Sequence, residues 1–134
     1  LLQATLSGDM ETVAELIEQA HQANASILKY NDENALSCVI SLAYYSAQKN
    51  YTLHREMPAG KGFADIVFEP NRNCDLPALI VELKWGHSAE EAVGQIKRKD
   101  YLDCLKNYTG EVLLVGVNYD KEKRHTCRIE RVKI

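Results

Sequence analysis

The segment Ala78–Lys84 constrains the fold of this chain most strongly, because it is an almost continuous apolar run. Such a run is typical of a strand that is buried on both faces of a sheet. The run Val112–Val117 has the same character, and Tyr51–Met57 and Thr126–Val132 alternate between polar and apolar residues as strands do. The sequence therefore predicts strands near residues 51–57, 62–68, 78–84, 111–117 and 126–132.

Three other segments have helical spacing. Apolar residues recur in this way from Leu6 to about Ala23, where Asp9 is suited to cap a helix. A second helix is expected over residues 32–48, and a third, capped by Ser88, over residues 88–105. The order helix, helix, three strands, helix, two strands predicts an α/β fold in which a mixed β-sheet core is flanked by helices.

Glu82 and Lys84 interrupt the apolar run of the central strand. They are two positions apart, so they project from one face with α-carbons about 6–7 Å apart. Buried charges are costly unless they are paired or bind a metal. Asp65 is the matching charged residue of the preceding strand, which should lie alongside. Two carboxylates beside an ammonium group predict a site for a hard cation such as Mg²⁺, with a salt bridge at the rim of the sheet as the alternative.

The cysteines and histidines follow neither a zinc pattern nor a disulfide pattern. The four histidines are scattered, and structural or surface roles are expected for them. Free thiols in a cytoplasmic protein are expected at the four cysteines, Cys38, Cys74, Cys104 and Cys127. No apolar run is long enough to cross a bilayer, so no membrane partner is expected. The net charge of −3 argues against coating nucleic acid by bulk electrostatics.

The ordered set of elements resembles the PD-(D/E)XK nuclease superfamily, which has a restriction-endonuclease-like fold. Three segments carry the resemblance: Gly60–Val67, Pro77–Lys84 and Ala92–Tyr101. The resemblance extends from Asn31 to about Ile134, and more narrowly the set looks like the bacterial branch found C-terminal to an AAA-ATPase-like domain. Ala64 stands where the superfamily's name has Pro, a position that takes no part in the chemistry.

The resemblance implies roles for individual residues. The implied metal ligands are Asp65, Glu82, the main-chain carbonyl of Leu83 and Glu33. Lys84 would be the catalytic lysine, and Gln95 would be the polar residue that the superfamily places on the following helix. Tyr101 fits the pattern of the branch. Glu33 could instead be a helix-start residue favoured by the helix dipole, and Gln95 and Tyr101 could be ordinary helix residues.

Two functions follow from this resemblance. The first is Mg²⁺-dependent (or Mn²⁺-dependent) hydrolysis of phosphodiester bonds in DNA by an endonuclease domain. The second is a non-catalytic nucleic-acid-binding or regulatory module attached to an upstream AAA-ATPase-like domain. In either case residues 1–30 would be a helical extension and 31–134 the nuclease-like core of a single domain, cut from the C-terminal part of a longer chain. RNA as the substrate, and a homo-oligomeric state, both stay open.

Overall fold

A computed structural model describes residues 1–23, 37, 39–41, 43–59, 62–72, 74–98, 110–120 and 124–133 of the chain. Their centre is a five-stranded sheet in the order β1-β2-β3-β4-β5. The strands are β1 (Tyr51–Ala59), β2 (Gly62–Pro70), β3 (Ala78–Trp85), β4 (Glu111–Asp120) and β5 (Arg124–Lys133). β3 and β4 run parallel, and the other neighbouring pairs run antiparallel. The predicted α/β fold with a mixed sheet is confirmed.

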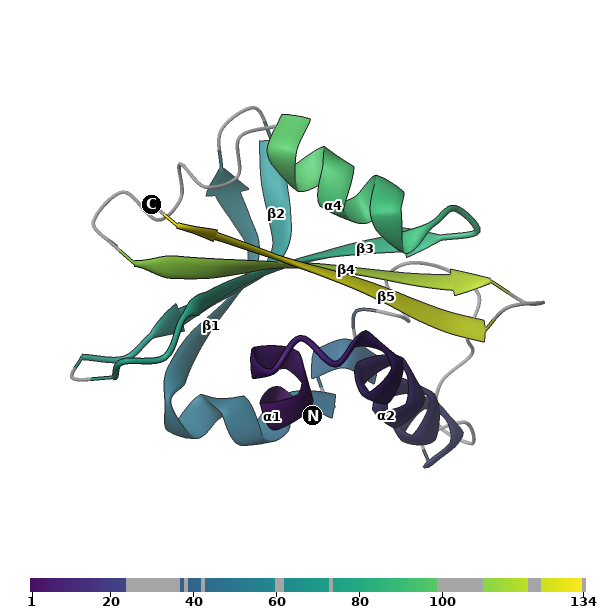
Figure 1. The fold of residues 1–134 in the computed structure, drawn as a ribbon, viewed down its shortest axis with the longest axis horizontal. Coiled ribbons are helices and arrows are strands. Elements are labelled where there is room, and N and C mark those ends of the chain that lie inside the picture. Colours follow the sequence, from purple (N-terminus) through teal and green to yellow (C-terminus); the bar gives the residue numbers. More distant parts are fainter. Residues whose placement is uncertain are drawn as a thin grey trace.

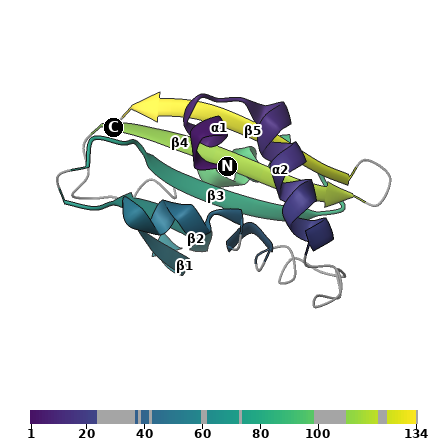
Figure 2. The ribbon, with the colours of Figure 1, turned by 90° about the horizontal axis from the view of Figure 1, so that it is seen from below.

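Helices cover both faces of this sheet (Figure 1). The helix α4 (Ala89–Arg98) lies on one face and provides the crossover that a parallel strand pair requires. On the other face lie α1 (Leu2–Leu6) and α2 (Met10–Ala23), which pass over β4 and β5 in the turned view (Figure 2). The described residues between 37 and 43 are helical and lead into the short 3₁₀ helix η1 (Tyr45–Lys49). In the part of the chain that the structure describes, no helix is long and apolar enough to span a membrane.

The N-terminal region differs from its prediction: the helix expected from Leu6 to Ala23 begins at Met10 (α2), and a separate short helix, α1, precedes it. Gly8 separates them with a φ of +75°, a left-handed conformation that favours glycine. Asp9 then caps α2 as expected: Asp9 Oδ1 accepts a hydrogen bond from the main-chain N–H of Thr12, at 3.2 Å. The glycine and the cap together turn the chain between α1 and α2.

The strands place two apolar cores on opposite faces of the sheet. On β3, Leu79, Val81 and Leu83 belong to the core that also contains Val13 and Ile17 of α2. Ala78 and Ile80 alternate with them and pack with Val93 and Ile96 of α4. Because side chains alternate along a strand, the next two members of the second series, Glu82 and Lys84, face α4. The sequence predicted this separation of the two faces.

The observed element ends differ from the predicted ones by a few residues. β4 runs on to Asp120 because Asn118 and Tyr119 continue the pairing with β3. Ser88 Oγ accepts from the N–H of Glu91 at 3.1 Å, which confirms the predicted cap of α4. The expected continuation of α4 to residue 105, and most of the expected helix over residues 32–48, lie outside the described residues.

Candidate active site

The strands β2 and β3 bring Asp65 and Glu82 together. Ile66 pairs with Val81 in this antiparallel ladder, so the next position of the same register sets Asp65 opposite Glu82. Asp65 Oδ2 accepts a hydrogen bond from the main-chain N–H of Leu83, at 2.8 Å. The side chain of Asp65 is thereby fixed against β3, immediately beside the carboxyl group of Glu82.

Gln95 of α4 connects the two charged residues of β3. Its Nε2 donates to Glu82 Oε1 at 2.5 Å, and its Oε1 accepts from Lys84 Nζ at 2.5 Å. One amide group therefore orients the carboxyl group and the ammonium group together. Asp65, Glu82, Lys84 and Gln95, the four predicted catalytic residues, form one cluster between the sheet and α4.

Gly116 allows α4 to approach this cluster. It pairs with Glu82 across the parallel β3–β4 ladder. A Cβ atom at position 116 would lie 2.3 Å from the main-chain oxygen of Ala89, closer than nonbonded atoms can approach. Only glycine lets the first turn of α4 pack onto β4 at this distance, and Gln95 reaches β3 from this position of the helix.

The environment of Glu82 strongly favours its protonated form. Glu82 is 3% exposed. This burial is the main cause, and the nearby charge of Asp65 the second, that raises the pKa of Glu82 to about 8. The charge of Lys84 acts in the opposite direction. Glu82 Oε2 is buried and accepts no hydrogen bond from any described residue. A positive ion between the two carboxyl groups would offset the repulsion between their charges. It would also give Glu82 Oε2 a partner. The residues present therefore fit a divalent cation.

The other predicted site residues are only partly described. Leu83 lies between Glu82 and Lys84 and its N–H binds Asp65, while the role of its carbonyl as a metal ligand stays a prediction. Glu33 and Tyr101 lie outside the described residues. Of the four predicted free cysteines, Cys74 and Cys127 are free thiols, and the other two lie outside the described part.

Asn118 is a supporting residue that the sequence reasoning missed. It is 3% exposed and holds the turn after β3: its Oδ1 accepts from His87 N–H at 3.0 Å, and its Nδ2 donates to the His87 carbonyl at 3.2 Å. Gly86 makes this turn with a φ of +72°, and its N–H binds the Tyr119 carbonyl. The turn leads directly into α4, so Asn118 helps to set the position of Gln95. Its signal in the sequence is a polar residue directly after the apolar run Val112–Val117.

A mixed five-stranded sheet packed against helices, with paired carboxylates and a lysine on its central strands, is consistent with the restriction-endonuclease-like α/β fold. The sequence pattern of the PD-(D/E)XK nuclease superfamily matches residues 31–129, and the chain belongs to that superfamily. Members of the superfamily typically use divalent metals, and membership indicates a nuclease-like activity on nucleic acid. No curated protein and no solved structure matches the chain significantly.

Proposed function

We propose that this chain is a Mg²⁺- or Mn²⁺-dependent endonuclease that hydrolyses phosphodiester bonds in DNA. The observation that carries the proposal is the buried Oε2 of Glu82, which has no hydrogen-bond partner among the described residues and adjoins Asp65. Carboxylate oxygens are the ligands that a hard cation prefers. Asp65 and Glu82 would hold this cation, with the Leu83 carbonyl and Glu33 as further proposed ligands.

The chain's own residues divide the chemistry between them. When bound, the cation supplies positive charge against the phosphate oxygens. Lys84, oriented by Gln95, positions the attacking water and helps to neutralise the phosphate. The water gives up one proton as its oxygen forms a new P–O bond, one ester P–O bond breaks, and the leaving oxygen takes up a proton. Gln95 hydrogen-bonds to both Glu82 and Lys84 and so fixes the position of each side chain relative to the other.

A plasmid-nicking assay tests this proposal. The wild-type protein should nick supercoiled DNA in the presence of Mg²⁺ or Mn²⁺, and Asp65→Asn should remove the activity. Asp75→Asn is the matched control, because Asp75 is an exposed acidic residue in the connection between β2 and β3. Undiminished nicking by Asp65→Asn would contradict the assignment.

Calorimetric titration with Mn²⁺ tests the metal site without relying on activity. Binding should be lost in Glu82→Gln and kept in Glu69→Gln, where the carboxyl group is exposed on β2. Equal Mn²⁺ affinity in wild type and Glu82→Gln would refute the site.

The alternative function is a non-catalytic module that binds nucleic acid or regulates an attached domain. The net charge of −3 leaves this alternative open, since it weakens the bulk attraction to DNA on which a nuclease would draw. A folded wild-type protein that binds Mn²⁺ and DNA but does not nick DNA would support this alternative. Incubating single-stranded RNA in place of plasmid DNA, under the same conditions, tests whether the chain cleaves RNA or DNA.

We further propose that the chain belongs to the bacterial, cytoplasmic branch in which such a domain follows an AAA-ATPase-like domain. The helices α1 and α2 support this, because a helical segment ahead of the nuclease-like core fits that branch. The proposal places this segment in residues 1–30 and the core in residues 31–134 of one domain. Sequencing the coding region upstream of Leu1 tests it: a different kind of domain encoded there would contradict it.

A further inference from the structure

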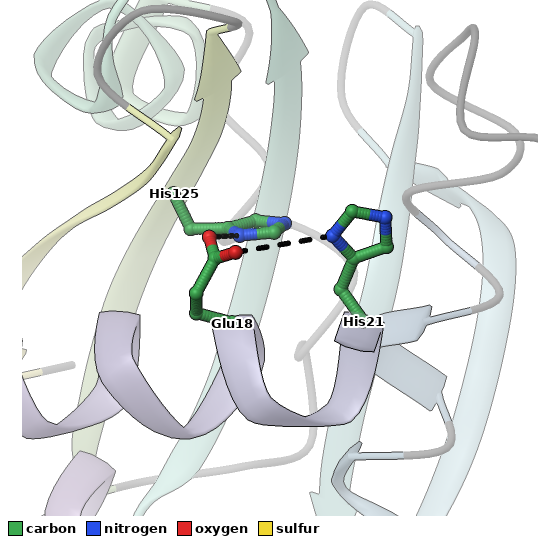
Figure 3. Close-up of side chains that lie close together, drawn as sticks. All are labelled: Glu18, His21 and His125. Carbon is green, nitrogen blue, oxygen red and sulfur yellow. Dashed lines mark hydrogen bonds and ion pairs between the residues drawn. The ribbon is translucent and has the colours of Figure 1, made fainter. Parts of the chain in front are cut away.

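Three potential metal-binding side chains meet on the face of the sheet opposite to Glu82 and Lys84. Glu18 and His21 lie one turn apart on α2, and His125 reaches them from β5 (Figure 3). Each offers one ligand atom, and these atoms all lie within 4.8 Å of one another. His125 Nδ1 is 2.6 Å from Glu18 Oε1, and His21 Nδ1 is 4.0 Å from Glu18 Oε2. Ligand atoms about 2 Å from a tetrahedral cation lie about 3.3 Å apart, which is within the largest separation of these three atoms, 4.8 Å.

Burial acts on all three side chains, and a hydrogen bond joins two of them. Burial lowers the pKa of His125 and of His21. Burial alone would raise the pKa of Glu18, but hydrogen bonds from His125 and Arg124 outweigh it and the pKa is lowered. Nδ1 of His125 faces Glu18 Oε1, so a metal ion bound between them would take the place of the proton in this hydrogen bond.

The surroundings hold the trio in place. Arg124 donates from Nε to Glu18 Oε2 at 3.0 Å, which leaves Oε1 directed at His125. Tyr119 packs its ring against His125, with centroids 4.9 Å apart, and makes an edge contact with His21. Outer groups of this kind orient the ligands in metal sites. His125 also lines a cavity of about 330 Å³, together with Met10, Glu11, Ala14, Thr126 and Cys127.

We propose that Glu18, His21 and His125 form a second metal site, for a borderline transition-metal ion such as Zn²⁺, that fastens α2 to β5. Two imidazoles and one carboxylate are the ligands of Zn²⁺ and its neighbours and not of Mg²⁺. Three protein ligands leave one coordination position for water.

The site joins two parts of the chain that differ in their family relationship. His125 lies within the segment matched by the nuclease superfamily, residues 31–129, whereas Glu18 and His21 lie before it. A bound ion would therefore couple the N-terminal helices to an edge strand of the nuclease-like sheet. This inference does not depend on the proposed nuclease activity, because the two ligand sets lie on opposite faces of the sheet.

Titration with Zn²⁺, in excess Mg²⁺ that occupies the hard-cation site, tests the proposal. Wild type should bind one Zn²⁺ per chain and show a higher Tm with Zn²⁺ than without. His21→Ala should weaken Zn²⁺ binding by about 100-fold or more, since loss of an outer group alone weakens binding by roughly 10- to 100-fold. His87→Ala is the matched control, because His87 is an exposed histidine paired with Glu91 on α4, and it should bind Zn²⁺ like wild type.

Substituting Co²⁺ identifies the ligand atoms. Visible absorption bands of a nitrogen- and oxygen-ligated Co²⁺ support the trio, whereas a sulfur-to-metal charge-transfer band would assign the ion to a cysteine and overturn the proposal. Equal Zn²⁺ affinity in wild type and His21→Ala, or no Zn²⁺ binding by wild type, would also overturn it. If His21→Ala does not fold, judged by circular dichroism, His21→Gln carries the same test with a polar side chain of similar reach.

Discussion

Glu82 and Glu18 are both carboxyl groups packed between a helix and the sheet, but their pKa values shift in opposite directions. Burial and the charge of Asp65 raise the pKa of Glu82 to about 8. Burial also acts to raise the pKa of Glu18, but hydrogen bonds from His125 and Arg124 more than offset it. The difference lies in the neighbour: Glu82 faces a second acid, and Glu18 faces a guanidinium and an imidazole.

This comparison explains why the two faces of the sheet suit different ligands. The α4 face carries two adjacent carboxyl groups, and a hard cation would balance their charge. The carboxylate on the α2 face is already compensated by Arg124, so an ion there must also be attracted by the imidazole nitrogens. If the two faces are independent, a substitution on one face leaves the chemistry of the other face unchanged.

The largest effect is expected for Lys84→Ala. Removing the ammonium group that Gln95 holds should lower the nicking rate by roughly 10²–10⁴-fold, the usual contribution of a positioned proton-transfer group. Mn²⁺ binding should persist, because the variant removes a competing positive charge beside Asp65 and Glu82. Lys84→Arg keeps the charge but transfers no proton at neutral pH. Nicking by the Arg variant would indicate a purely electrostatic role, and nicking by the Ala variant would remove Lys84 from the site.

The control for this comparison is Lys49→Ala, which removes an exposed lysine from η1. Its nicking rate should equal that of wild type. A comparable loss in Lys49→Ala would mean that the assay reports general charge attraction to DNA.

The second prediction concerns pH and the metal-free protein. The pKa of Glu82 is about 8 in the folded chain and 4.5 as its ordinary value, so folded Glu82 retains its proton over this range while the unfolded chain loses it. The contribution of this group to the free energy of unfolding is therefore fully present below pH 4.5. It is lost as the pH rises through 8. At about 1.4 kcal/mol per pKa unit, the loss is on the order of a few kcal/mol.

Urea unfolding at pH 5 and pH 8.5 in the presence of a chelator measures this loss. Glu82→Gln should show a smaller decrease in the free energy of unfolding than wild type. Adding Mg²⁺ at pH 8.5 should restore stability to wild type and not to the variant. A pH dependence that is identical in both proteins would show that Glu82 titrates normally.

The third prediction concerns the packing that positions Gln95. Gly116→Ala places a methyl group against the Ala89 main-chain oxygen, so α4 must move away from β4. Overpacking of this kind costs roughly 1–3 kcal/mol of unfolding free energy, which urea unfolding measures. Nicking should fall as well, because Gln95 moves with the helix. An unchanged stability and nicking rate would show that α4 adapts without loss of the site.

The smallest effect is expected on the α2 face. Tyr44→Phe removes a hydroxyl group that lies 2.6 Å from Thr5 Oγ1 in the buried core, at a cost of about 1 kcal/mol in unfolding free energy. Tyr45→Phe is the control, because Tyr45 is 69% exposed and should be neutral. The nicking rate per folded molecule should be unchanged in both variants. A lower rate in Tyr44→Phe would show that the two faces are coupled.

The sequence by itself predicted the five strands and the face that the two charged residues of β3 share. The alternation along β3 predicted that Glu82 and Lys84 share a face, because a strand repeats every two residues. Asp9 and Ser88 were predicted as caps because a cap depends on residues within one turn. These features are local, so neighbouring residues encode them. The separate short helix α1 was not predicted, although the Asp9 cap already placed the start of α2 after Gly8.

Only the tertiary structure decided which distant groups meet. Gln95 joins Glu82 and Lys84 because Gly116 allows α4 to approach the sheet, a condition set by a residue on another strand. Glu18 and His125 are separated by 107 positions, and their scattered spacing predicted only structural or surface roles for the histidines. The pKa of Glu82 also depends on its burial and on its closeness to Asp65, and both arise only when the sheet forms. Contacts between distant residues, and the energies that follow from them, arise only when the helices close over the two faces of the sheet.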